Sequence, residues 1–116
     1  MDRRADGRQL AVRASEPERT PDGRYIVVRG RRWRAADPEL PADVRDALQH
    51  HLGRARSAVR TGRQSGDDDA VRRARDRVGL AKHGLGERGD PWWDLDLAQR
   101  RERWEQARAE LDRTES

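Results

Sequence analysis

The chain of 116 residues contains no cysteine and no phenylalanine, and it has a single tyrosine. The lack of cysteine excludes both a disulfide framework and a thiolate metal site. No apolar run approaches the roughly 20 residues of a membrane-spanning helix, and residues 1–15 lack the apolar segment of a signal peptide. We therefore expect a cytoplasmic protein with no membrane partner.

Large aliphatic residues are also scarce. Leucine, isoleucine and valine together number 17, a proportion close to that of disordered chains. The 26 basic and 22 acidic residues nearly cancel, however, and leave a net charge of +4. Arginine supplies all but one of these basic residues, a bias typical of GC-rich bacterial genomes. We expect one small domain with a thin core, which folds because its few apolar residues share faces.

The segment 24–35, RYIVVRGRRWRA, combines β-branched and aromatic residues with a charge of +5, whereas residues 90–116 carry −3. Its basic residues are Arg24, Arg29, Arg31, Arg32 and Arg34, and no acid lies among them. Arginines at this density can contact phosphates, and a β-ribbon is narrow enough to enter a major groove. They can equally pair with the acidic C-terminal segment, within the chain or across a dimer.

The same segment predicts a two-stranded β-hairpin, since strand-like runs flank Arg29-Gly30. A two-residue turn pairs residue 28 with residue 31 and residue 26 with residue 33. We assign the face with Ile26, Val28 and Trp33 to the core. The opposite face carries Tyr25, Val27, Arg32 and Arg34. A two-stranded hairpin is marginal in water, so it must pack on helices or on another chain.

Three helices are predicted after the hairpin, over 42–61, 68–83 and 95–113, with residues 62–66 as a loop. Apolar residues recur at spacings of three and four in the first two helices, which we expect to form an antiparallel pair. Asp94 is the expected N-cap of the last helix. The predicted fold is mainly α with a small β-hairpin, in a single domain over 22–113. Residues 1–21 are interpreted as a flexible arm and 114–116 as a tail.

The four tryptophans are the largest side chains available to the core. We interpret them, together with two aliphatic residues of the hairpin, as core or interface anchors. This set comprises Ile26, Val28, Trp33, Trp92, Trp93 and Trp104.

Sequence patterns give little support for a cofactor or a metal. Gly84, Gly86 and Gly89 have the spacing of a dinucleotide fingerprint, but they follow a predicted helix instead of joining a strand to a helix. We interpret them as a helix stop and a turn. The adjacent His50 and His51 point about 100° apart on a helix and cannot easily bind one ion, and His51 is interpreted as a core histidine.

The acidic run 67–69 is interpreted as a set of helix caps, with a hard-cation site as the alternative. There is no thiol, and no histidine is spaced from an acid as a catalytic pair would require. We therefore expect no enzyme, no catalytic residue, no metal and no cofactor.

Two functional hypotheses remain. The first is a small non-enzymatic interaction protein, whose narrow helix seams pack against a second copy or a helical partner protein. The alternative is a nucleic-acid-binding module that uses the hairpin arginines.

The segments DGRYIVVRGRRWRA and GERGDPWW resemble a family of small bacterial proteins of uncharacterised function. That family shows DGRYIVVxGRRWRA, arginine-rich helices and a GExGxPWW box, and some members carry the label of Tol-type biopolymer transporters. The resemblance covers residues 22–94 and implies a folded domain without an assigned active site. The family favours Asp-Gly in the turn, where this chain has Arg29-Gly30.

Overall fold

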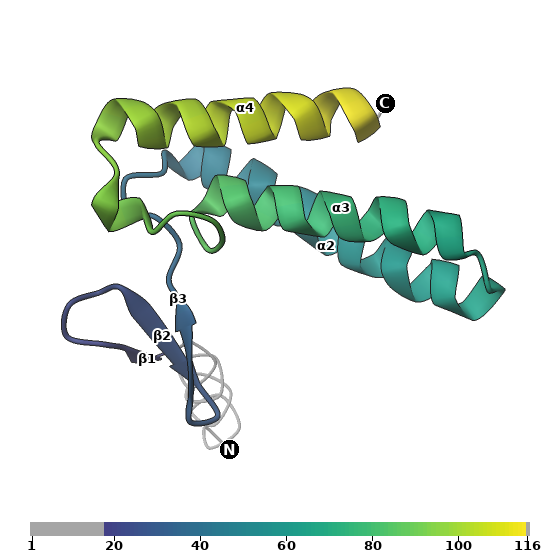
Figure 1. Ribbon diagram of the computed structural model, residues 1–116, viewed down its shortest axis with the longest axis horizontal. Coiled ribbons are helices and arrows are strands. Elements are labelled where there is room, and N and C mark those ends of the chain that lie inside the picture. Colours follow the sequence, from purple (N-terminus) through teal and green to yellow (C-terminus); the bar gives the residue numbers. More distant parts are fainter. Residues whose placement is uncertain (1–17, 116) are drawn as a thin grey trace, which may run out of the picture. The chain divides into compact units, whose positions relative to one another are not determined.

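The computed structural model describes residues 18–115 and shows a mainly α protein that begins with a small antiparallel sheet (Figure 1). This fold class confirms the sequence prediction. The chain divides into two compact units at residues 35 and 36, where the sequence predicted one domain. Of the predicted arm, residues 1–17 lie outside the described part, as does residue 116. The elements are strands β1 (Glu18–Arg19), β2 (Tyr25–Val28) and β3 (Arg31–Arg34), helices α2 (Ala42–Ser65), α3 (Asp68–Leu85) and α4 (Leu97–Glu115), and a 3₁₀ turn, η1 (Trp92–Asp94).

The N-terminal unit contains three strands in the order β1-β2-β3, where the sequence predicted two. The arm was therefore predicted to extend too far, because Glu18 and Arg19 pair with Val27 and Ile26 of β2. A turn after β1 makes this pairing possible. Its Thr20 hydroxyl donates to the Asp22 carboxylate at 2.6 Å, which also accepts the backbone N–H of Arg24 at 3.0 Å.

The register of β2 and β3 confirms the prediction, with Ile26 opposite Trp33 and Val28 opposite Arg31. Arg29 and Gly30 have φ angles of 53° and 77°. Two positive φ angles are what a type I′ turn requires, and its twist matches that of the flanking strands.

The assignment of the Ile26 face to the core is wrong for two of its three residues. Val28 is 39% exposed and Trp33 is 44% exposed, while Ile26 is half-buried. The strands are only four residues long and offer little apolar area to cover an indole. Instead, the guanidinium of Arg31 lies over the Trp33 ring, 4.3 Å from its centroid.

Helices α2 and α3 form the predicted antiparallel hairpin within the second unit (Figure 1). Helix α2 continues through most of the predicted loop and ends at Ser65, followed by Gly66, whose φ of 71° suits a left-handed C-cap. Gly62 lies inside the helix and lets α3 approach closely, since an added Cβ would lie 2.9 Å from Cγ2 of Val71. The Asp67 side chain accepts the backbone N–H of Ala70, which confirms the cap at the start of α3.

Helix α4 packs against both α2 and α3. Its N-cap is Asp96 and not Asp94, because η1 occupies residues 92–94. The Asp96 carboxylate accepts the backbone N–H of Gln99 at 2.8 Å, and the Gln99 side chain accepts that of Asp96 at 3.1 Å, a capping box. Gly84 permits close contact with α4, since an added Cβ would lie 2.6 Å from that of Ala107.

The core of the helical unit combines aliphatic side chains from all three helices with one tryptophan. Its fully buried large residues are Leu48, Leu85 and Leu111, and Trp104 packs with them at 3% exposure. Many of the few large apolar residues are thus gathered at this one junction, where they form a contiguous core despite the composition.

A buried ion pair ties four segments of the helical unit together. Asp37 is 3% exposed, and both of its carboxylate oxygens accept from the guanidinium of Arg100, one at 2.8 Å from Nε. This contact raises the pKa of Arg100 above its ordinary value. The Asp37 backbone N–H donates to the Leu85 carbonyl at 2.8 Å, and Arg100 lies 5.3 Å from the centroid of the Trp92 ring.

Candidate functional site

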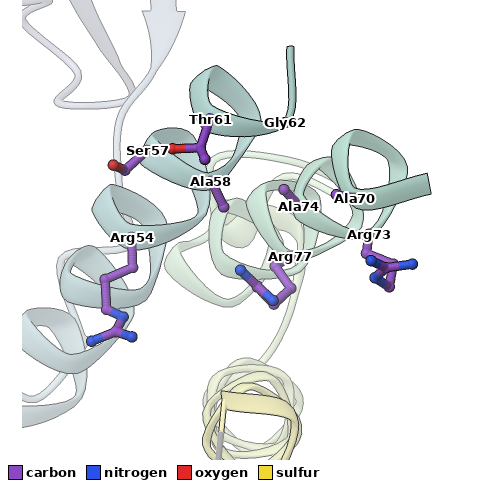
Figure 2. A pocket seen from close by; sticks show the side chains of 9 residues that line it. All are labelled: Arg54, Ser57, Ala58, Thr61, Gly62, Ala70, Arg73, Ala74 and Arg77. Carbon is purple, nitrogen blue, oxygen red and sulfur yellow. The ribbon is translucent and has the colours of Figure 1, made fainter. Parts of the chain in front are cut away.

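A groove runs between the distal halves of α2 and α3 and has a volume of about 490 Å³. Figure 2 shows small side chains between the two helices and arginine side chains projecting at the margins. The lining residues are Arg54, Ser57, Ala58, Thr61 and Gly62 from α2, and Ala70, Arg73, Ala74 and Arg77 from α3.

The groove begins where α4 ends. Helix α4 covers the first half of α2, and the distal ends of α2 and α3 continue past it (Figure 1). Thr114, in the last turn of α4, lines a second hollow of about 170 Å³ together with Arg54, Ala58 and Arg77. The two hollows share Arg54, Ala58 and Arg77. The groove therefore continues the surface of α2 and α3 on which α4 packs, which we call the α4 channel.

Two of the groove arginines have no acidic partner within residues 18–114. Asp69 forms its ion pair with Arg72, which leaves Arg73 exposed and uncompensated, and Arg77 is half-buried and likewise without an ion pair in this range. The floor is weakly polar, because Ala74 is buried and Ala58 and Ala70 are half-buried. The groove therefore combines an apolar floor with a positive margin.

The N-terminal unit presents the second candidate surface. Antiparallel pairing places Arg19, Ile26 and Trp33 in one row across the sheet, next to the pair Val28 and Arg31. We call these five residues the Trp33 face.

The opposite face of the sheet carries the remaining paired residues. Arg32 lies over the Tyr25 ring at 4.3 Å, and Glu18 and Arg34 also lie on this side, paired with Val27 and Tyr25. The predicted arginines are therefore divided between the two faces. Arg24 precedes β2, and Arg29 lies at the turn.

The tryptophans predicted as anchors do not form one site. Trp92 and Trp104 are buried in the helical unit at 8% and 3% exposure, and Trp93 is half-buried with its ring edge-to-face to that of Trp92, 5.1 Å between centroids. Trp33 alone is exposed. The core interpretation therefore applies to the C-terminal tryptophans, while Trp33 is left as a surface residue.

His51 is a buried, hydrogen-bonded core histidine, as predicted. It is 7% exposed, and its Nε2 lies 2.7 Å from Oδ1 of Asp112. Sequence reasoning did not find this pair because 61 positions separate its members. Thr114, which lines the same hollow as His51, donates its hydroxyl to the Leu111 carbonyl at 3.2 Å.

The end of α3 carries titratable groups with displaced pKa values. Burial, followed by the nearby Arg103 guanidinium, lowers the pKa of His83 below its usual range. Burial also raises the pKa of Glu87 and lowers that of Lys82. Gly86 ends α3 in a left-handed C-cap with a φ of 86°, which confirms the predicted helix stop for this glycine. Gly89 has a φ of 81° in the segment that follows, whereas Gly84 lies inside α3 and is not part of the stop.

Within residues 18–114, whose side chains the structure describes, no three His, Asp or Glu side chains are grouped so that they could hold a metal ion. In the same range, no helix has both the length and the apolar character needed to cross a membrane. The chain matches no family model, no curated protein and no solved structure. The resemblance to the DGRYIVV family therefore stays a prediction.

Proposed function

We propose that the protein is a non-enzymatic interaction module that binds an acidic amphipathic helix of a partner protein in the groove between α2 and α3. The observation that carries this proposal is the open continuation of the α4 channel. Beyond the end of α4, the same two helices present small residues between them and arginines beside them.

The shape of the groove suits a helix. The distance between packed helices depends on the side chains at the contact, and Ala58, Ala70 and Ala74 allow a close approach. From residue 54 to residue 62, α2 lines the groove over roughly 12 Å, about two helical turns. A helix lying in such a groove places residues at spacings of three and four on the floor.

Helix α4 shows how such a helix is held. It places Leu111 in the core and flanks it with polar contacts, from Asp112 to His51 and from Arg108 to Asp43. In the open groove, the flanking groups on the α2–α3 side include Arg73 and Arg77. The complementary partner therefore carries glutamate or aspartate beside a stripe of small apolar residues.

An NMR titration of the full-length protein tests this proposal. The probe is a helical peptide of about 12 residues, long enough for the two-turn groove, with an alanine and leucine stripe flanked by glutamates. We expect saturable shifts at the amides of Ala58, Ala70 and Ala74, and none with a matched peptide that carries lysines. Arg77→Gln weakens binding several-fold, whereas Arg75→Gln, outside the groove on the same helix, does not.

Two outcomes would contradict the proposal. The first is an equal response to the glutamate and lysine peptides, because it would remove charge complementarity from the argument. The second is a concentration-dependent dimer, measured by light scattering, that Arg77→Gln abolishes. That result would assign the groove to a second copy of the chain.

A further inference from the structure

We infer that the Trp33 face of the N-terminal sheet binds single-stranded nucleic acid, with the Trp33 indole stacking on a base and arginine side chains contacting phosphates. This surface lies in a different unit from the groove, so the inference goes beyond the proposed function.

The first argument is the composition of the face. Trp33 and Val28 are 44% and 39% exposed, and Arg19 and Arg31 are also exposed. Among the strand residues that the structure describes, the one acid, Glu18, pairs with Val27 and so lies on the opposite face. The Trp33 face therefore combines an exposed tryptophan and an exposed valine with the positive charge of two exposed arginines.

The second argument is the arrangement of the aromatic and the cation. The Arg31 guanidinium lies 4.3 Å from the Trp33 centroid, and within the described part of the N-terminal unit no acid pairs with it. An exposed indole beside an uncompensated guanidinium offers a stacking surface and a phosphate contact in one place. Stacking on aromatic side chains and arginine contacts to the backbone are the two interactions that hold single strands on proteins.

The third argument excludes a duplex as the preferred ligand. In a duplex the base faces are covered by neighbouring bases, so an indole on a sheet surface cannot stack on them. Strands β2 and β3 each span roughly 13 Å at 3.3 Å per residue, so the face accommodates only a short stretch of nucleotides. We expect weak binding without sequence preference.

Fluorescence anisotropy with labelled oligothymidylate tests the inference on the full-length chain. Binding is expected at about 50 mM salt and falls as salt rises, because phosphate contacts release counterions. The matched variants are Arg31→Gln and Arg32→Gln, adjacent residues on opposite faces that each lie 4.3 Å from an aromatic ring. Arg31→Gln weakens binding several-fold and reduces the salt slope by about 0.7, whereas Arg32→Gln changes both much less.

Substitution of Trp33 separates stacking from charge. Trp33→Thr keeps a strand-forming residue and removes the indole, and we expect a roughly tenfold loss of affinity. Trp33→Phe retains most of the affinity. The NMR amide spectrum of each variant reports whether the sheet is intact. If Trp33→Thr disrupts the sheet, the comparison of Arg31→Gln with Arg32→Gln decides whether this face binds the oligonucleotide.

The inference is overturned by any of four results: no binding at low salt, equal losses in Arg31→Gln and Arg32→Gln, unchanged affinity in a folded Trp33→Thr, or tighter binding to the matching duplex than to the single strand. Stronger binding to anionic lipid vesicles than to the oligonucleotide would also reject it, in favour of a membrane surface. Arg77→Gln leaves oligonucleotide binding unchanged, which distinguishes this surface from the groove.

Discussion

Each of the two units contains an arginine stacked on a tryptophan, and the difference between these pairs is an acid. In the helical unit, Arg100 lies over Trp92 and is neutralised by Asp37, which is 3% exposed. In the sheet, Arg31 lies over Trp33 with no acidic partner among the described residues of its unit, and the indole is 44% exposed.

The comparison shows that the same type of side-chain pair differs in its surroundings: one guanidinium is bonded to a buried carboxylate and the other faces solvent. A buried guanidinium needs a carboxylate, because an unpaired buried charge is strongly unfavourable. Once paired, its donors are occupied and the contact is structural. An exposed guanidinium keeps its hydration and its charge, so it remains available to a phosphate or to another anion.

The largest effect on the free energy of unfolding is expected from removing the ion pair between Asp37 and Arg100. Asp37→Ala leaves the partly buried guanidinium of Arg100 without its carboxylate, and we expect the free energy of unfolding of the helical unit to fall by about 3 kcal/mol. Arg31→Gln is the matched change in the exposed pair, and we expect it to change the free energy of unfolding of the sheet by less than about 0.5 kcal/mol. Urea denaturation followed by circular dichroism measures both. Similar losses in the two variants would remove the distinction between the pairs.

A smaller effect concerns the turn of the sheet. Arg29 adopts a φ of 53°, a conformation in which asparagine is much more common than arginine. Arg29→Asn is expected to stabilise the sheet by roughly 0.5 kcal/mol. Hydrogen exchange at the amides of β2 and β3 measures it, and amides of α2 serve as the internal control. Faster exchange in the sheet would contradict this expectation.

The smallest effect depends on pH and is expected in the helical unit. The pKa of His83 is lower in the folded chain than its usual value of 6.5, so the unfolded chain binds a proton more readily. Its contribution to stability is therefore complete above pH 6.5 and decreases as the pH falls towards the folded pKa. His83→Gln should flatten this part of a stability profile between pH 7.5 and pH 5, measured by thermal melting. An unchanged slope in the variant would assign the effect to another group.

The candidate surfaces were only partly predictable. The five hairpin arginines and the β2–β3 register follow from local rules, since a two-residue turn determines which residues face each other. The groove could not be predicted from local sequence rules, because Arg73 and Arg77 belong to a helix rich in arginine and have no distinguishing neighbours in the sequence. Their shared position in the groove became evident only from the packing of α2 on α3 and from the end of α4, where Thr114 lies beside Arg54 and Arg77.

The sequence by itself determined the mainly α class, the number and order of the helices and the turn at Arg29-Gly30, because periodicity and turn chemistry act over a few residues. Only the tertiary structure decided the rest: the third strand, the cap at Asp96, the pairing of Asp37 with Arg100, and the exposure of Trp33. Each of these depends on partners distant along the chain, or on how much apolar area the neighbours can supply. Arg31 and Arg100 are the same residue type stacked on the same ring type, and their surroundings alone make one a surface residue and the other the partner of a buried carboxylate.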